Sequence, residues 1–76
     1  MDEFVGYLIK NLVDKPDAVE IKIFDEEKDT ILEVRVSPED IAKVVGRQGK
    51  TIKSLRTIAT GVGARLGRRV RLELIN

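Results

Sequence analysis

The chain has 76 residues, a formal net charge of +1, and neither cysteine nor histidine. This length predicts one domain with a small core. Hydrophobic residues make up 42% of the chain and charged residues of both signs 36%, a mixture typical of a globular fold. The absence of cysteine excludes disulfides and thiolate metal sites, and the absence of histidine removes the commonest general base and metal ligand.

No apolar run approaches the ~20 residues that a membrane-spanning helix needs. The start of the chain is acidic, unlike a secretory signal, so we expect a cytoplasmic protein without a membrane partner.

The charges are distributed unevenly along the chain. Every acid except Glu73 lies in residues 1–40, whereas residues 41–72 contain nine basic residues and no acid. This asymmetry predicts a directional electrostatic surface that suits an anionic partner. The alternative is that these bases are ordinary solvated positions on helices and an edge strand.

The first half of the sequence predicts a helix followed by a hairpin. Apolar residues recur at helical spacing over Glu3–Val13, and Pro16 ends this helix. The segments Val19–Phe24 and Ile31–Val36 alternate as strands do, and the polar turn Asp25–Asp29 between them favours antiparallel pairing. This turn lacks the glycine and the ligand spacing of a calcium loop, so we expect no metal there.

The second half predicts two helices and a strand. Ser37 is placed to cap a helix, with Pro38 at its first position and Asp40 three residues after the cap. The apolar face of this short helix consists of Ile41, Val44 and Val45. Gly46 can end it in a left-handed conformation.

A second helix is expected from about Gly49, and its core stripe would be Ile52, Leu55, Ile58, Ala59, Val62 and Leu66. Gly67 is a plausible stop, and Arg68–Ile75 alternates as a last strand. Gly61 and Gly63 leave the length of this helix open, because glycine disfavours a helix interior.

The expected order is therefore α-β-β-α-turn-α-β without an internal repeat or linker. Three strands covered by three helices on one face make a two-layer α+β domain. We expect a single domain over residues 1–76, with the N-terminal helix and hairpin in 1–36 and the remaining elements in 37–76.

The turn Gly46-Arg47-Gln48-Gly49 between the two helices carries the functional hypothesis. Glycine has no Cβ, so a ligand backbone can approach closely, and the first N–H groups of the following helix lack internal partners and favour an anion. Arg47 and Lys50 add positive charge and Gln48 a neutral donor, while Val45 and Ile52 can form the floor of a groove for bases. We therefore predict that the turn holds the sugar-phosphate backbone of single-stranded RNA.

The segment from Val45 to Ile52 resembles the signature of KH domains, in which Gly-x-x-Gly stands between aliphatic residues at fixed spacing. The element order resembles the type II KH topology, with the extra helix and strand N-terminal to the core. The small size is similar to that of the KhpA family, bacterial RNA-binding proteins with one KH domain. The resemblance covers nearly the whole chain.

The resemblance implies a groove for about four nucleotides, with the Gly-x-x-Gly loop against their backbone. Ile41 joins Val45 and Ile52 on the apolar side, and Arg68, Arg69 and Arg71 are further candidate phosphate contacts. The candidate RNA-binding residues are Gly46, Arg47, Gln48, Gly49, Lys50, Ile41, Val45, Ile52, Lys53, Arg68 and Arg69.

The resemblance also implies homodimers, heterodimers with the larger RNA-binding protein KhpB, and a role as post-transcriptional regulator or RNA chaperone in cell-envelope growth, cell shape and division. We expect no enzymatic activity, no cofactor and no small-molecule substrate.

Three other interpretations compete with this one. Gly49-Lys50-Thr51 matches the end of a nucleotide-binding P-loop, but the first glycine of that motif would fall on Val44 and a strand should precede it. A helix-turn-helix DNA-binding domain would need a third supporting helix and a recognition helix with base-reading side chains. Finally, the glycines could merely shape a tight turn in a protein–protein adaptor.

Overall fold

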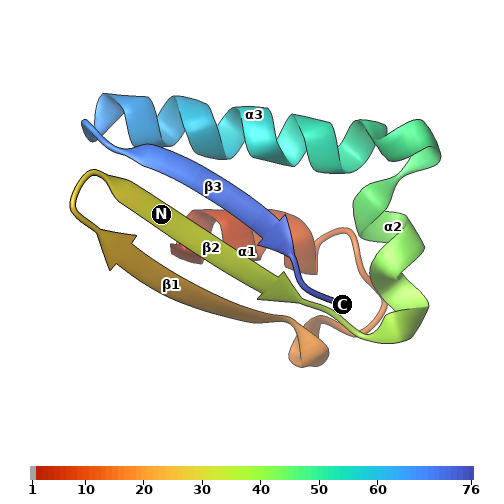
Figure 1. Cartoon of the computed structure of the whole chain (residues 1–76). Coiled ribbons are helices and arrows are strands. Elements are labelled where there is room, and N and C mark those ends of the chain that lie inside the picture. Colours follow the sequence, from red (N-terminus) through yellow and green to blue (C-terminus); the bar gives the residue numbers. More distant parts are fainter. Residues whose placement is uncertain (1) are drawn as a thin grey trace.

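The helices and strands follow one another in the predicted order. The computed structural model describes residues 2–76, so Met1, the first residue of the predicted domain, lies outside the described residues. The elements are α1 (Asp2–Lys10), η1 (Pro16–Ala18), β1 (Glu20–Glu26), β2 (Asp29–Arg35), η2 (Pro38–Asp40), α2 (Ile41–Val45), η3 (Arg47–Gly49), α3 (Lys50–Arg65) and β3 (Arg69–Leu74) (Figure 1). The α+β class is confirmed. No helix within residues 2–76 is both long and apolar enough to cross a membrane.

The sheet has the strand order β1-β2-β3. The hairpin strands β1 and β2 are antiparallel, with Ile23 opposite Leu32, whereas β3 returns parallel to β2, with Leu32 opposite Leu72. The parallel pairing needs a long crossover, which α2 and α3 provide. Both β1 and β3 are therefore edge strands.

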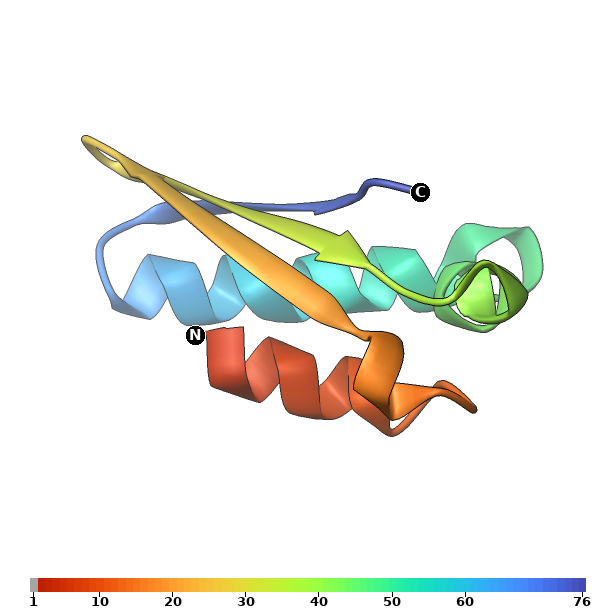
Figure 2. The same cartoon turned by 90° about the horizontal axis from the view of Figure 1, so that it is seen from below.

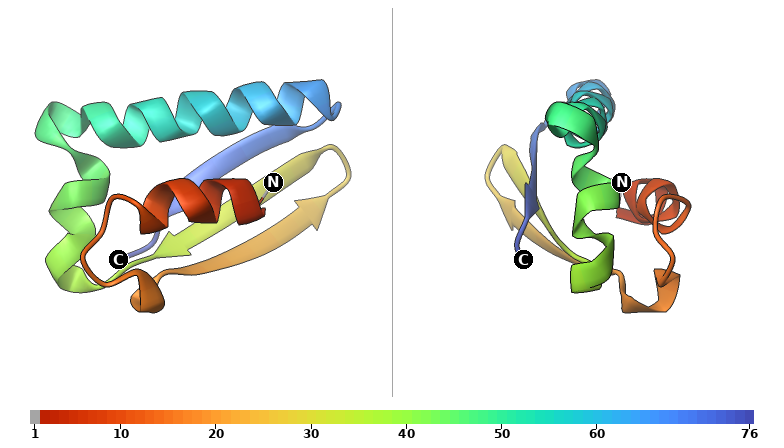
Figure 3. Two further views of the ribbon diagram at one scale, coloured as in Figure 1. Left: turned by 180° about the vertical axis from the view of Figure 1, so that it is seen from behind. Right: turned by 90° about the vertical axis from the view of Figure 1, so that its right-hand side faces the viewer.

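All three α-helices lie on the same side of the sheet: α1 and α3 pack on its face, and α2 lies beyond the end of β2 (Figures 1 and 2). The other face is left open (Figure 3). Alternate residues of β2, among them Leu32 and Val34, point into this layer and are fully buried. The buried apolar residues are Val5, Ile9, Leu32, Val34, Val36, Val44, Ile52, Leu55, Ala59, Val70 and Leu72. One continuous core thus joins the sheet to all three α-helices.

The hairpin is tighter than the sequence predicts. Only Glu27 and Lys28 lie outside the strands, because Asp25 and Thr30 remain paired in the ladder. The Thr30 hydroxyl donates to the Asp25 carboxylate over 2.7 Å, which holds this pair together. The expected five-residue turn was therefore wrong by three residues.

The first helix ends at Lys10 and not at Val13, so Leu12 lies beyond it and is 38% exposed. The reason lies in Asp40, which is 1% exposed. Its carboxylate accepts hydrogen bonds from the backbone N–H groups of Asp14 and Lys15, at 3.2 and 3.0 Å. The chain has to leave the helix early to bring these two groups there.

The start of the second helical segment also differs from the expected cap. Residues Pro38–Asp40 form a 3₁₀ turn, and Ser37 makes no side-chain capping bond. Asp40 bonds across the molecule to the α1–η1 connection and not back to Ser37, so the predicted capping arrangement was wrong. The capping pattern cannot reveal a partner 25 residues away in the sequence.

The helix α3 runs unbroken through both interior glycines to Arg65, which answers the question of its length. A Cβ on Gly63 would lie 2.3 Å from Val70 Cγ2, so this glycine lets α3 pack closely on β3. Gly67, with φ +73°, ends the helix as predicted. In contrast to the predicted stripe, Ile58 and Leu66 are 39% and 62% exposed.

Candidate nucleic-acid interface

The backbone of the glycine turn bends sharply between α2 and α3. Gly46 has φ +77° and ψ 174°, a region that is essentially restricted to glycine. A Cβ there would lie 2.1 Å from Thr51 Oγ1 and 2.9 Å from the Thr51 backbone nitrogen. Thr51 therefore packs in the place that a side chain at position 46 would fill, a contact that the sequence motif did not reveal.

The second half of the turn is left-handed. Gln48 has φ 56° and ψ 25°, and Gly49 has φ 75° and ψ 13°. A Cβ on Gly49 would meet no atom within 4 Å, so the space in front of this residue is open. No side chain caps the N-terminus of α3. The N–H groups of Gly49 and Lys50, however, donate to the backbone oxygens of Gly46 and Arg47. The prediction that these first N–H groups are free was therefore wrong, and the positive end of the helix dipole is what remains to attract an anion here.

Charged and polar side chains gather around this open backbone. Arg47, Gln48, Lys50 and Lys53 are all exposed. None of the ion pairs among the described residues involves Arg47, Lys50 or Lys53. The turn therefore presents positive charge that internal acids do not neutralise.

The apolar residues of the predicted groove differ in how deeply they are buried. Ile41 and Val45 on α2 are half-buried, whereas Ile52 on α3 is only 7% exposed and belongs to the core. The two half-buried residues offer surface to a ligand, while Ile52 supports them from below.

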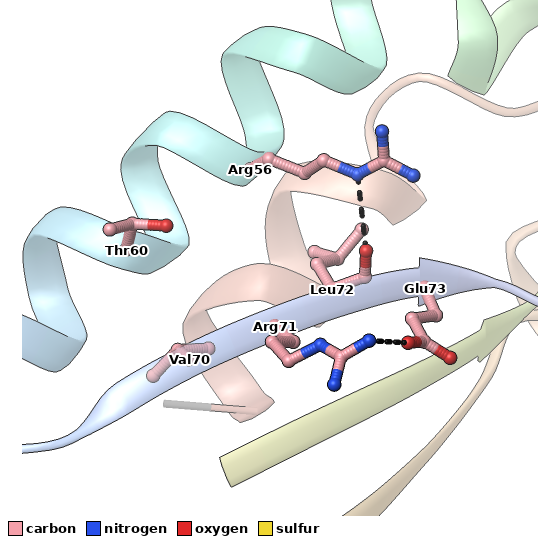
Figure 4. Close-up of a pocket in the computed structure, with 6 residues that line it drawn as sticks. All are labelled: Arg56, Thr60, Val70, Arg71, Leu72 and Glu73. Atoms are coloured by element: carbon pink, nitrogen blue, oxygen red, sulfur yellow. Dashed lines mark hydrogen bonds and ion pairs between the residues drawn. The ribbon is translucent and has the colours of Figure 1, made fainter. Parts of the chain in front are cut away.

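A groove between α3 and β3 extends the site beyond the turn. It has a volume of about 310 Å³ and is lined by Arg56, Thr60, Val70, Arg71, Leu72 and Glu73 (Figure 4). Arg56 Nε donates a hydrogen bond to the backbone oxygen of Leu72 over 3.2 Å, and Arg71 pairs with Glu73 at 3.1 Å. The other N–H groups of Arg56 point away from this carbonyl group (Figure 4).

The groove exists because β3 is an edge strand. Strand pairing uses one side of β3, and the Arg56 bond shows that the carbonyl of Leu72 faces the other side, toward α3. Such an edge offers unpaired backbone donors and acceptors to a ligand. Arg56 lies seven residues after Gly49, about 10 Å along the helix, so turn and groove are close.

Comparison with known proteins agrees with this geometry. The family model described as "KhpA/KhpB, KH domain" matches residues 2–74. A Chlamydia pneumoniae protein named RNA-binding protein KhpA is 44% identical over 75 residues, which cover 99% of this chain and 96% of that protein. RNA-binding proteins KhpA of Borreliella burgdorferi and Streptomyces coelicolor are each 40% identical, over 97% and 100% of this chain and 90% and 92% of theirs.

The chain belongs to the KhpA/KhpB KH-domain family. The suspected membership is thereby confirmed, and with it the KH fold. Of the candidate residues, the structure brings together the four-residue turn, the neighbouring cations Lys50 and Lys53, and the apolar residues of α2 and α3. This set surrounds a KH-type Gly-x-x-Gly turn and adjoins the groove of Arg56, which the sequence had shown only as a helix surface position.

Two candidate arginines of this KhpA/KhpB-family domain lie elsewhere. Arg68 and Arg69 follow the C-terminus of α3, whereas the turn precedes its N-terminus, and sixteen helical residues separate the two by about 24 Å. The structure therefore does not bring these arginines to the turn. Their contact with RNA stays a prediction.

Both arginines already have partners in the hairpin. Arg68 donates to Thr30 Oγ1 at 2.6 Å and to the backbone oxygens of Asp29 and Glu27 at 2.8 and 3.1 Å. Arg69 Nε contacts the Asp29 carboxylate at 2.7 Å. These contacts hold the β1–β2 turn against the start of β3, which is a structural role.

The segment that carries the turn is anchored at its other end by Asp40. Burial disfavours its charged form, but the backbone N–H bonds from Asp14 and Lys15 and the nearby Lys43, with Nζ at 3.6 Å, outweigh this effect. The pKa of Asp40 therefore lies below its ordinary value of 3.8. Lys43 also pairs with Asp14, which raises the pKa of the lysine.

Proposed function

We propose that the chain is a non-enzymatic module that grips about four nucleotides of single-stranded RNA. The observation that carries this proposal is the turn itself: Gly46 cannot hold a side chain, and Gly49 faces open space. Arg47 and Lys50 beside these glycines take part in no ion pair among the described residues. A polynucleotide backbone needs both a close approach and positive charge. The names of the relatives, which specify RNA binding, support this choice of ligand.

In the proposed mechanism, one phosphate lies at the N-terminus of α3, where the helix dipole attracts it. Arg47 and Lys50 contact the same or the next phosphate. The bases then lie over Ile41 and Val45 and continue toward the groove beside β3, whose free edge and Arg56 offer donors and acceptors.

Binding by this site is weak and tolerant of sequence. Phe4, Tyr7 and Phe24 are the only aromatic residues of the chain, and none lies in the turn or the groove, so base stacking contributes little. Affinity then depends on phosphate contacts and apolar packing, which carry little sequence information. Rising salt weakens such binding because phosphate contacts release counterions.

Dimerisation would compensate for the weak RNA binding of a single chain. The proposal includes a homodimer and a heterodimer with a KhpB-like RNA-binding protein, because two linked sites bind one RNA with much higher avidity. The corresponding role is that of a post-transcriptional regulator or RNA chaperone linked to cell-envelope growth and division. The protein would bind its RNA targets in the cytoplasm.

The test replaces Arg47 and Gln48 with aspartate. Both side chains are exposed, and aspartate tolerates the left-handed backbone at position 48, so the melting temperature should barely change. Affinity for a short single-stranded RNA, measured by fluorescence anisotropy, should fall about tenfold or more, equivalent to roughly 1.4 kcal/mol.

The matched control is Lys10→Asp with Asn11→Asp, an exposed adjacent pair at the C-terminal end of α1 that changes the net charge by the same amount. Equal losses in both variants would mean diffuse charge attraction without a clamp. Unchanged binding in the first variant would exclude the turn as the RNA site. Preference for duplex DNA of the same length would instead favour the helix-turn-helix alternative.

A further inference from the structure

The outer strand β1 is unusually exposed for a strand of a small sheet. Of its seven residues only Ile21 is partly buried, while Ile23 and Phe24 are 41% and 45% exposed. β1 pairs with β2 alone, and among the described residues no element lies along its other edge (Figure 1). A free edge with large apolar side chains is a template for another strand.

The hairpin geometry determines which backbone groups face outward. The pair Glu26–Asp29 flanks the two-residue turn, so it is hydrogen-bonded, and hydrogen-bonded pairs alternate from there. Phe24 therefore directs its N–H and C=O groups to β2. Ile23 and Asp25 direct theirs to the free edge, where they can bond to a further strand.

This edge is complementary to itself in one register. When two copies of β1 run antiparallel about a two-fold axis at Phe24, Lys22 of each copy lies opposite Glu26 of the other. Ile23 and Asp25 then exchange backbone hydrogen bonds across the seam. Opposite charges and facing aromatic residues both stabilise cross-strand pairs.

Neighbouring two-fold registers place like charges opposite each other. An axis at Lys22 sets Lys22 against itself. An axis at Ile23 sets Glu20 against Glu26, and an axis at Asp25 sets Asp25 against itself and Lys22 against Lys28. The charge pattern thus selects one register of the strand with its own copy, which supports a second copy over an unrelated peptide.

The open face of the sheet adds an apolar contact at the same place. Phe24 lies opposite Ile31 of β2 on the face that no helix covers. In the two-fold arrangement, the two Phe24 rings meet between the two Ile31 side chains and form one apolar row across four strands. Each exposed phenylalanine thereby loses part of its contact with water.

We propose that two copies of the chain associate edge to edge through β1, in the register that places Phe24 opposite Phe24. This inference rests on the homodimer that belongs to the proposed function and names its surface, but it does not depend on the RNA grip at the other end of α3. Because one pair of short strands buries a small area, the association is weak.

The test exchanges the charges of Lys22 and Glu26, which lie opposite each other between the two β1 strands of the proposed dimer. Lys22→Glu and Glu26→Lys each place like charges opposite each other, so each single variant should dissociate the dimer at least about tenfold more readily. The double variant K22E/E26K restores both ion pairs with reversed signs and keeps the net charge. It should therefore dimerise like the original chain, as sedimentation equilibrium over roughly 10 μM to 1 mM can show.

Lys50→Glu, an equal charge change remote from β1, is the control and should leave self-association unchanged, while thermal melts establish that each variant is folded. Dimerisation that is unchanged in all β1 variants would overturn the proposed surface, although it would still show that the chain self-associates. A chain that stays monomeric throughout, or one that binds only a different extended peptide at β1, would overturn the proposal. RNA affinity is measured separately, and its loss or retention bears only on the turn.

Discussion

At the scale of single residues, Gly46 and Gly49 look alike in the sequence but differ in the structure. Both have positive φ, yet only Gly46 has Thr51 packed where a Cβ would lie. Gly46→Ala should therefore lower the free energy of unfolding by about 3 kcal/mol, through backbone strain together with overpacking. Gly49→Ala should cost only about 1 kcal/mol, from the left-handed backbone alone.

Urea unfolding of the two variants measures this difference, and equal losses would contradict the packing role of Thr51. The sequence predicted the two glycines correctly, because their spacing matches a known turn. It could not predict the Thr51 contact, since packing of a side chain against a neighbouring turn depends on dihedral angles that no spacing rule contains.

At the scale of elements, α3 contains two interior glycines with opposite consequences. A Cβ on Gly61 meets no atom within 4 Å, whereas one on Gly63 strikes Val70. Gly61→Ala should stabilise the chain by about 1 kcal/mol, because alanine is the better helix former. Gly63→Ala should destabilise it, because α3 must move away from β3.

Chemical denaturation of both variants tests this pair, and destabilisation by Gly61→Ala would show that the position is not open. Periodicity alone indicated where α3 begins and where Gly67 ends it. It could not separate the two glycines, since their difference lies in the neighbouring strand. Nor could periodicity show that Ile58 and Leu66 are exposed, and Leu66 lies beyond the end of α3 at Arg65.

At the scale of the whole molecule, Asp40 connects the N-terminal segment to the helices around the turn. Its pKa is depressed in the folded state, so its contribution to stability is present above the pKa of the unfolded chain, about 3.8. That contribution is lost as the pH falls through the lower, folded-state value. The chain should thus become less stable in acid below about pH 4.

Replacing Asp40 with asparagine should lower the melting temperature at neutral pH and flatten the acid dependence, while leaving the turn exposed. Melting curves of both chains between acid and neutral pH provide the measurement. If the two curves stay parallel over that range, other carboxylates cause the acid sensitivity.

The pairing of strands that are distant in the sequence limits what the sequence could predict about the whole molecule. The class, the element order and the single helical layer follow from local patterns and chain length. The position of β3 at a sheet edge, and with it the groove of Arg56, arises from parallel pairing of residues such as Thr30 and Val70. Local patterns contain no information about which distant strands become neighbours.

The close approach of α3 to β3 at Gly63 makes the length of this helix a property that evolution can hardly alter. One inserted residue would rotate everything beyond it by about 100°. Gly63 would then turn away from Val70 and a bulkier neighbour would face the strand. The spacing between Gly49 and Gly63 should therefore stay fixed among descendants of this chain.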